Sequence, residues 1–217
     1  MENTDKCENI KKSTNFAQKL SAERDDREFM ECESFSGELI SGADASGMEF
    51  KNVIFENCGF CDCIFKGASF YDCTFKNCTV KMCDFQNVYL RGVKISDSVL
   101  ESCSFAGCHI KESHFKESSL RYGNFHSGVI ERTEFADCSF KEASLAEMRL
   151  TRPVFSGCDF TGADFFKTPL KGIDFSDCDI TAVALSETLR ELKGAKVSAQ
   201  QAVEIARLIG VKIVPGK

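Results

Sequence analysis

An apolar residue stands at every fifth position of the chain from Phe35 to Leu185, without a change of phase. The set has 31 members, of which 17 are Phe, and the others are Leu, Ile, Val or Ala. A period of five matches neither the 3.6-residue turn of an α-helix nor the two-residue alternation of a continuous strand. The pattern therefore indicates an internal repeat, and internal repetition determines the architecture before any other sequence signal.

The residue two positions before each of these apolar residues, here called the small position, is mostly small and is Cys at ten places. These cysteines are Cys58, Cys63, Cys73, Cys78, Cys83, Cys103, Cys108, Cys138, Cys158 and Cys178. In an extended segment residues i−2 and i point to the same side, so each unit can send one large and one small side chain inward. Gly, Asn, Asp and Ser are common at the remaining positions and favour a turn. We therefore predict an all-β solenoid whose coils stack about 4.8 Å apart.

The limits of the repeat divide the chain into three expected parts. Residues 34–187 would form the solenoid, and residues 188–217 a C-terminal capping and dimerisation segment. Residues 1–33 do not keep the register and are expected to form an irregular N-terminal segment and cap. Its apolar side chains that could cover the end of the rod are Phe16, Leu20, Phe29 and Met30.

A short α-helix is predicted near the C-terminus, over residues 199–209. Ser198 and Gln201 have the Ser-x-x-Gln spacing of a capping box, and Gly210 is a stop signal. The residues of its apolar face that we expect to mediate dimerisation are Val203, Ile205, Ala206, Leu208 and Ile209. The same face could cover the apolar end of the solenoid, which such rods require, and the two roles are compatible.

The repeat units resemble those of the pentapeptide-repeat family. Their form is a small residue, then a polar one, then Leu or Phe, as in Cys58-Gly59-Phe60, Cys73-Thr74-Phe75 and Ala163-Asp164-Phe165. The resemblance covers about 150 of the 217 residues. It implies a right-handed quadrilateral β-helix, with four units in each coil.

The C-terminal segment is similar to that of one branch of this family, which contains the Qnr and mycobacterial fluoroquinolone-resistance proteins and the albicidin-resistance protein. The similarity rests on Gly194-Ala195-Lys196-Val197, Gln200-Gln201-Ala202-Val203, Ala206 and Gly210-Val211. It implies a homodimer joined tail to tail through the terminal helix. It also implies a non-catalytic, DNA-mimicking binder of DNA gyrase or topoisomerase IV, with resistance to quinolones or to a toxin as a consequence.

The formal net charge of −6 hides an uneven distribution. With four units per coil, residues 20 apart share a face. The face with Phe35 and Phe55, the first face, carries seven carboxylates and three lysines, whereas the face with Phe50 and Phe70, the fourth face, carries seven basic and four acidic side chains. The carboxylates that we expect to contact a partner, here called the acidic set, are Glu117, Glu134, Asp137, Asp174 and Asp177. Rows of carboxylates on a rod can imitate the phosphate track of DNA and be attracted to a DNA-binding groove.

Two other interpretations of the charges stay open. The spread could be a scatter of solvated charges that serves solubility. Alternatively, the chain could be a general protein-interaction rod with an unknown partner, which uses its basic fourth face. Function does not follow from fold, so the repeat alone does not separate these hypotheses.

Chemistry at an active site is not expected. We find no Ser-His-Asp or Cys-His arrangement, phosphate-binding loop, dinucleotide fingerprint or zinc spacing, and predict a non-enzyme without cofactor or metal. Cys58, Cys61 and Cys63 look like a metal cluster, but Cys61 should point outward and the other two inward.

The chain has no 18-residue apolar run and no signal-peptide core, so we expect a cytoplasmic protein without membrane association. Direct nucleic-acid binding is not expected either.

Overall fold

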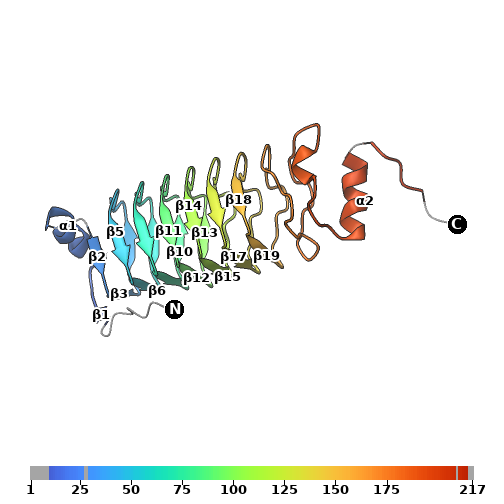
Figure 1. Cartoon of the computed structure of the whole chain (residues 1–217). Helices are drawn as coiled ribbons and strands as arrows, with labels where there is room; N and C mark the ends of the chain where they lie inside the picture. The colour runs from blue at the N-terminus through green and yellow to red at the C-terminus, as the bar shows by residue number, and fades with distance from the viewer. Residues whose placement is uncertain (1–9, 27–28, 209, 215–217) are drawn as a thin grey trace, which may run out of the picture.

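The computed structural model of the protein describes residues 10–26, 29–208 and 210–214. The chain forms a long rod of stacked coils with a helix at each end (Figure 1). From β2 to β17, strand residues pair in parallel with the residues 20 positions further along, as Phe55 does with Phe75. Twenty residues hold four five-residue units, so each coil has four sides. The all-β solenoid that the spacing predicts is confirmed, with the four sides that the resemblance implies.

The first face is a sheet of eight short strands. Its order is β1 (Lys11–Lys12), β3 (Glu33–Ser36), β6 (Ile54–Glu56), β9 (Thr74–Lys76), β12 (Lys94–Ser96), β15 (His114–Lys116), β17 (Glu134–Ala136) and β19 (Val154–Ser156). The second face begins with four strands, β4 (Leu39–Ser41), β7 (Gly59–Cys61), β10 (Thr79–Lys81) and β13 (Val99–Glu101). It continues as single parallel bridges, and the third face consists of such bridges throughout.

The fourth face is a sheet of seven strands. They are β2 (Phe29–Glu31), β5 (Glu49–Lys51), β8 (Ser69–Tyr71), β11 (Tyr89–Arg91), β14 (His109–Lys111), β16 (Val129–Glu131) and β18 (Arg149–Thr151). Since β2 pairs with β5, this sheet extends into the segment that the sequence assigns to the N-terminal cap.

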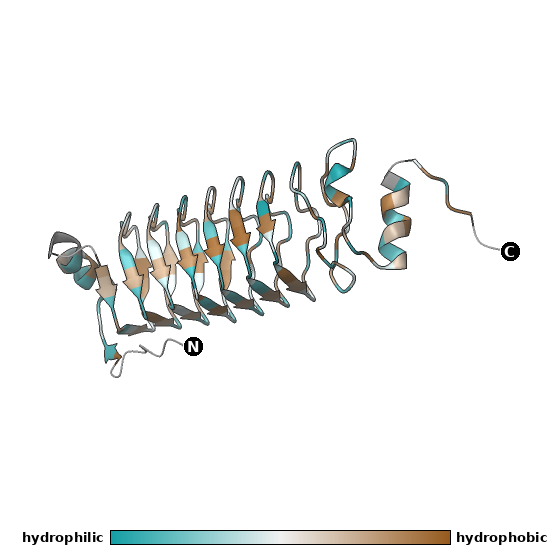
Figure 2. Cartoon of the chain, viewed as in Figure 1, coloured by the Kyte–Doolittle hydropathy of each residue, from teal (hydrophilic) through white to brown (hydrophobic). Residues whose placement is uncertain are grey.

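The repeating apolar residues form the core. All of them are buried except Leu150, Ile180 and Leu185, which are partly buried. Rings of successive coils stack in columns, so that the centroids of Phe85 and Phe105 lie 4.9 Å apart. Figure 2 shows the apolar segments recurring in successive strands. Burial of one Phe side chain contributes roughly 1.5–3 kcal/mol, so these columns stabilise a rod that has no other core.

The cysteines at the small position lie inside the coils, as the spacing predicts. All ten are buried and carry free thiols. The thiol of Cys73, for example, donates to the carbonyls of Phe50 and Tyr71 at 3.4 Å. Burial raises the pKa of the Cys73 and Cys108 thiols to about 12. The thiols of Cys73 and Cys108 therefore stay protonated at neutral pH and pack as small apolar groups.

The chain turns at the residue two positions after each apolar residue, which is here called the corner position. Most corner residues have a left-handed backbone, with φ of 55° at Asn57 and 52° at Asp97. Asn, Asp and Gly adopt this conformation more readily than other residues. Glu117 and Arg132 adopt it as well, with φ of 47° and 45°. The corners therefore present polar side chains in columns along the rod.

The sheets of the first and fourth faces end at the same level. In the next coil, Pro169 holds the position equivalent to Arg149 at the start of β18. Proline has no N–H with which to continue the ladder. The Arg132 N–H donates to the Thr151 carbonyl at 2.9 Å, but the Arg152 N–H makes no such backbone bond within the described part of the chain. The second and third faces keep their pairing past this level. The coils are thus less tightly joined here on two of their four sides.

After the regular repeat the chain makes one more, irregular part-coil. It contains the 3₁₀ helix η1 (Arg190–Leu192). The N–H of Leu170 donates to the carbonyl of Glu191, and the N–H of Phe175 to that of Lys196, both at 2.9 Å. The chain therefore stays bonded to the preceding coil as far as Lys196.

Helix α1 (Phe16–Asp26) closes the N-terminal end of the rod. Phe16 is fully buried and Leu20 is 5% exposed. The Phe16 ring lies 5.2–6.3 Å from the rings of the first core residues, which are Phe35, Phe50, Phe55 and Phe60. Of the other two apolar residues proposed for the cap, Met30 is buried within β2 and Phe29 is half-buried.

Two glutamates at small positions of the first coil anchor this helix. The carboxylate of Glu38 accepts hydrogen bonds from the N–H groups of Asn15 at 2.9 Å and Phe16 at 2.7 Å. Glu33 is buried, pairs with Lys19 at 2.5 Å and accepts a hydrogen bond from the Ser13 hydroxyl. Among the described residues no complete coil precedes the first one, so its small positions have room for long side chains that reach back to the helix.

Candidate functional site

Helix α2 (Ala199–Leu208) is attached to the last coil through one side chain. The predicted capping box is present: the Ser198 N–H donates to Gln201 Oε1 at 2.7 Å, and the Gln201 N–H donates to Ser198 Oγ at 3.3 Å. The Gln201 amide nitrogen also donates to the carbonyls of Phe175 at 2.8 Å and Cys178 at 2.7 Å. Gln201 therefore both starts the helix and satisfies two carbonyls of the last coil.

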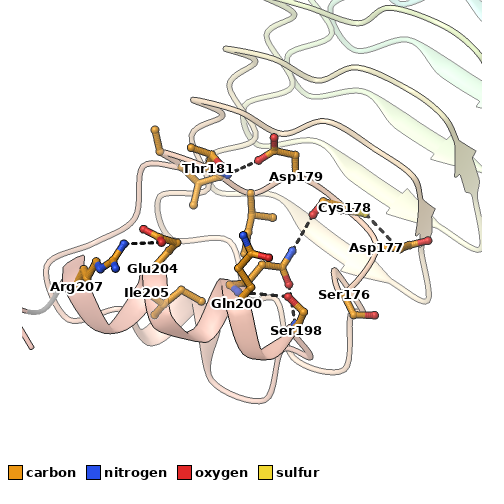
Figure 3. A pocket seen from close by; sticks show the side chains of 14 residues that line it. Ser176, Asp177, Cys178, Asp179, Thr181, Ser198, Gln200, Glu204, Ile205 and Arg207 are labelled. Carbon is orange, nitrogen blue, oxygen red and sulfur yellow. Dashed lines mark hydrogen bonds and ion pairs between the residues drawn. The ribbon is translucent and has the colours of Figure 1, made fainter. Parts of the chain in front are cut away.

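A cavity of about 730 Å³ separates α2 from the end of the rod (Figure 3). The last coil lines it with residues 176–183, and α2 lines it with Glu204, Ile205 and Arg207, among others. Ile180 and Val183, at the end of the core, are only partly buried. The helix thus leaves the apolar end of the solenoid incompletely covered.

The predicted dimerisation residues occupy different places on α2. Ile205 lines the cavity, and Val203 and Ala206 are half-buried. Ile209 lies outside the described residues, and so does the side chain of Leu208.

The five residues of the acidic set lie on the first face, and all are exposed. Glu117, Asp137 and Asp177 hold the corner position of their coils, while Glu134 and Asp174 precede the core residue. At about 4.8 Å per coil, the three coils from Glu117 to Asp177 cover roughly 14 Å of the rod. The structure therefore brings the five carboxylates into one patch.

Two lysines neutralise part of this patch, and a histidine lies beside it. Lys116 Nζ lies 3.1 Å from Glu117, His114 Nδ1 lies 3.2 Å from Glu134, and Lys196 Nζ lies 3.8 Å from Asp174. The pKa of Lys116 is raised by its hydrogen bond with Glu117 and, to a smaller extent, by the charges of Asp137 and Asp97.

Two further residues lie at this patch. Asp97 belongs to the same corner column as Glu117 and Asp137; the 20-residue spacing places it among the seven carboxylates of the first face, although it is not in the acidic set. Lys196 lies beyond the regular repeat, so no spacing rule could bring it to Asp174. Asp174 and Lys196 form a parallel bridge in the irregular part-coil.

The two aspartates nearest the C-terminal end are held by neutral donors. Asp174 Oδ1 accepts hydrogen bonds from the Ser176 hydroxyl at 2.7 Å and the Ser176 N–H at 3.0 Å. Asp177 Oδ2 accepts from the Ser156 hydroxyl at 3.0 Å and the Gly157 N–H at 3.2 Å. The serine hydroxyls in particular hold the pKa of both carboxyls below its usual range. Both groups are therefore fixed in position and ionised at neutral pH.

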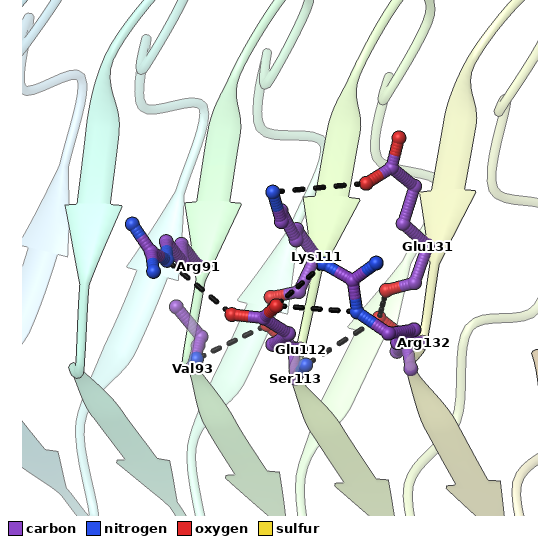
Figure 4. Close-up of polar contacts among 8 residues, drawn as sticks. Arg91, Val93, Lys111, Glu112, Ser113, Glu131 and Arg132 are labelled. Atoms are coloured by element: carbon purple, nitrogen blue, oxygen red, sulfur yellow. Dashed lines mark hydrogen bonds and ion pairs between the residues drawn. The ribbon is translucent and has the colours of Figure 1, made fainter. Parts of the chain in front are cut away.

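On the fourth face the basic side chains of the middle coils are paired (Figure 4). Glu112 accepts from Arg132 at 2.6 Å and from Arg91 at 3.4 Å, and Glu131 lies 3.8 Å from Lys111. The Arg132 guanidinium holds the pKa of the Glu112 carboxyl below its usual range. The net positive charge of this face therefore does not come from its middle.

Metal and membrane sites were also sought in the structure. Within residues 10–26, 29–208 and 210–214, no three His, Cys, Asp or Glu side chains converge in a way that could hold a metal ion. Cys58 and Cys63 are buried, whereas Cys61 is half-exposed. None of the described helices combines the length and apolar character needed to cross a bilayer.

Two sequence-family models match the chain. One, described as a pentapeptide repeat region, matches residues 48–125, and the other, described as pentapeptide repeats in eight copies, matches residues 130–165. Together these stretches cover more than half of the chain. The chain belongs to the pentapeptide-repeat family. No protein in a search of curated sequences matches it significantly.

Solved structures similar to this pentapeptide-repeat protein include two trypsin-treated variants of QnrB1, a plasmid-mediated fluoroquinolone resistance protein. One is 25% identical, with a TM-score of 0.54 over 84% of this chain and 90% of that chain. The other is 23% identical, with a TM-score of 0.54 over 84% and 92%. HetL, involved in heterocyst differentiation regulation in the cyanobacterium Nostoc, is 14% identical, with a TM-score of 0.42 over 84% and 97%. The right-handed quadrilateral β-helix that the resemblance implies is confirmed.

Proposed function

We propose that this pentapeptide-repeat protein is a non-catalytic, cytoplasmic binder of DNA gyrase or topoisomerase IV, which presents its acidic set in place of DNA. The observation that carries the proposal is the patch of five exposed carboxylates on one flat face of a rigid rod. The likeness to QnrB1 at 25% identity supports it, because that protein is a fluoroquinolone resistance protein. Protection of the enzyme from quinolones or from a toxin would then be the biological effect.

The electrostatics of the patch favour such a partner. Asp174 and Asp177 are ionised at neutral pH, and their serine donors hold the pKa of both carboxyls below its usual range. Asp137 makes no ion pair with any described residue. A positively charged DNA-binding surface would attract these groups, and attraction between complementary surfaces mainly raises the association rate. Lys116 and Lys196 reduce the charge of the patch without removing it.

The proposed active form is a homodimer joined through α2. The cavity beside α2 and the partly buried Ile180 and Val183 leave apolar surface at this end, which a second copy could cover. Tail-to-tail pairing would also bring two acidic sets together on one longer particle, which resembles a segment of duplex more closely than one set does.

Supercoiling by purified gyrase, with and without the protein, tests the proposed target. We expect inhibition at micromolar protein, and relief of quinolone-induced cleavage. The triple variant Glu117→Lys, Glu134→Lys, Asp137→Lys should weaken the effect about tenfold, since each exposed charge pair contributes up to about 1 kcal/mol. The matched control Asp62→Lys, Glu142→Lys, Glu187→Lys makes the same charge change on other faces and should weaken it less than twofold. If the wild-type protein causes neither inhibition nor relief, gyrase is not its target.

The proposed dimer is tested by the mass of the particle in solution. The chain has a mass of 24.1 kDa, so light scattering should give twice this value for the wild-type protein. Ile205→Asp places a charge in the cavity and should give monomers. Leu39→Asp, at a 91% exposed site near the other end, should leave the dimer intact. A dimer that survives Ile205→Asp would place the interface elsewhere.

A further inference from the structure

The C-terminal part of the fourth face carries basic side chains that no carboxylate neutralises. Arg149, Arg152 and Lys171 are exposed, and none of them forms an ion pair within the described part of the chain. We propose that these three residues, here called the basic end, form a docking site for a short acidic segment of a partner protein. This site is separate from the acidic set and does not depend on the proposed gyrase function.

The contrast with the middle of the same face carries the argument. There, Glu112 and Glu131 occupy the corner and strand positions and neutralise Arg91, Lys111 and Arg132. One and two coils beyond Glu131 the strand position holds Thr151 and Lys171, and two and three coils beyond Glu112 the corner position holds Arg152 and Gly172. The described part of the rod therefore offers no carboxylate to these cations. The acceptors for their N–H groups must come from water or from a partner.

The chain beyond the regular repeat extends this patch. The Lys171 side chain packs closely over Gly194, and the Gly172 N–H donates to the Gly194 carbonyl at 2.8 Å. Two more exposed cations, Arg190 and Lys193, lie in this part-coil. Of the two acids in this segment, Glu187 is exposed, whereas Glu191 is buried and accepts a hydrogen bond from the Ser186 hydroxyl at 2.8 Å. With Arg190, Lys193 and Lys196 against one exposed carboxylate, the last part-coil adds positive charge.

The backbone at this level differs from the rest of the face as well. Pro169 ends the ladder, and the Arg152 N–H makes no backbone hydrogen bond within the described residues, although the equivalent Arg132 N–H does. An amide donor beside two guanidinium groups suits a carboxylate, because charge-assisted bonds from N–H groups to carboxylates are short and strong. Arg also presents paired donors that match both oxygens of a carboxylate.

The dimensions and the surrounding charge favour an acidic peptide over a nucleic acid. From the level of Arg149 to that of Lys193 the patch covers two coils, roughly 10 Å, which an extended segment of three or four residues spans. The neighbouring first face is acidic on both sides of Val154, with Glu134 before it and Asp174 after it. At physiological salt the Debye length is about 8 Å, so a short segment is influenced mainly by the basic end. A long polyanion would also meet the acidic face.

Fluorescence anisotropy with a labelled ten-residue peptide of alternating Glu and Ser, in 50 mM NaCl, tests the site. The variant Arg149→Glu, Arg152→Glu, Lys171→Glu should bind the peptide at least tenfold more weakly than the wild-type protein. The matched control Lys66→Glu, Lys81→Glu, Lys94→Glu changes the net charge equally on other faces and should bind it less than twofold more weakly. Circular dichroism should show both variants folded, because all six side chains are exposed.

Three results would overturn the proposal. They are the absence of peptide binding by the wild-type protein, an equal loss in both triple variants, and tighter binding of a 20-base-pair duplex than of the peptide at the same site. Gyrase inhibition measured on the same two variants should stay unchanged. A failure of the gyrase proposal would therefore leave the peptide result intact, and the reverse also holds.

Discussion

The two ends of the rod are closed in different ways. At the N-terminal end, α1 places the fully buried ring of Phe16 against four core rings, and Glu38 caps the helix. At the C-terminal end, α2 is held by the amide of Gln201, and a cavity of about 730 Å³ separates it from the last coil. The chain covers the core at the first end, whereas apolar surface stays uncovered at the second end.

The difference follows from the residues that each helix offers. Phe16 has the same shape as the core residues and packs among the first core rings, with edge-to-face contacts at 5.2 and 5.5 Å to Phe35 and Phe55. The apolar face of α2 has no aromatic residue, and Ile205 lines the cavity without filling it. A cap that matches the repeat covers the end of the core, and one that does not leaves part of the core exposed.

The largest effect that separates the two ends is expected from Phe16→Ala. Removing a fully buried ring should lower the free energy of unfolding by about 3–5 kcal/mol, as measured by urea denaturation. Phe166→Ala removes the same group at a 40% exposed site and should cost less than about 0.5 kcal/mol. Equal losses in the two variants would mean that α1 is not part of the core.

A smaller and local effect is expected from Gln201→Ala. The variant loses two hydrogen bonds to the last coil, each worth about 0.5–1.5 kcal/mol. Hydrogen exchange in α2 should become about tenfold faster, while the urea midpoint of the solenoid stays the same. Gln200→Ala, the adjacent residue in the helix, should leave the exchange unchanged. Unaltered exchange in Gln201→Ala would mean that other contacts hold α2.

The corresponding change at the N-terminal end is Glu38→Ala. This variant removes the acceptor of two N–H groups at the start of α1, a loss of about 1 kcal/mol for a helix cap. Exchange should speed up in α1 and not in α2, and Glu142→Ala, at an exposed site in the middle of the rod, should affect neither helix. Faster exchange in both helices would show that the two ends are coupled.

The smallest expected effect is the pH dependence of the stability that Asp177 contributes at the C-terminal end. Because the pKa of Asp177 is lowered in the folded state, chiefly by Ser156, its stabilising contribution is present above the unfolded pKa of about 3.9. That contribution is lost as the pH falls through the folded value. Asp177→Asn should therefore lower stability at pH 7 by less than about 1 kcal/mol, since the group is exposed, and change nothing at pH 2. A loss of equal size at both pH values would point to a cause other than the charge.

Much of this architecture could be predicted from the sequence. The unbroken phase from Phe35 to Leu185 assigns inside and outside to each residue, and four units per coil place Glu117, Asp137 and Asp177 in one column. The capping box at Ser198 and Gln201 was also visible, because it depends only on local spacing.

What could not be predicted depends on contacts outside the repeat. Lys196 reaches Asp174 through a bridge offset by 22 residues, two more than the regular coil. The second role of Gln201, as a donor to the last coil, needed the position of the helix. The end of the fourth-face sheet, by contrast, could have been predicted from the sequence. Pro169 occupies a strand position, where its missing N–H interrupts the ladder.

The 20-residue register has a consequence for how the length of such a protein can change. An insertion of 20 residues within the repeat would add one complete coil and leave every later side chain pointing in its former direction. An insertion of five residues would keep the core intact but rotate everything after it by a quarter turn. Asp174 and Asp177 would then no longer share a side with Glu117, so the rod could keep its fold and lose its charge pattern in one genetic event.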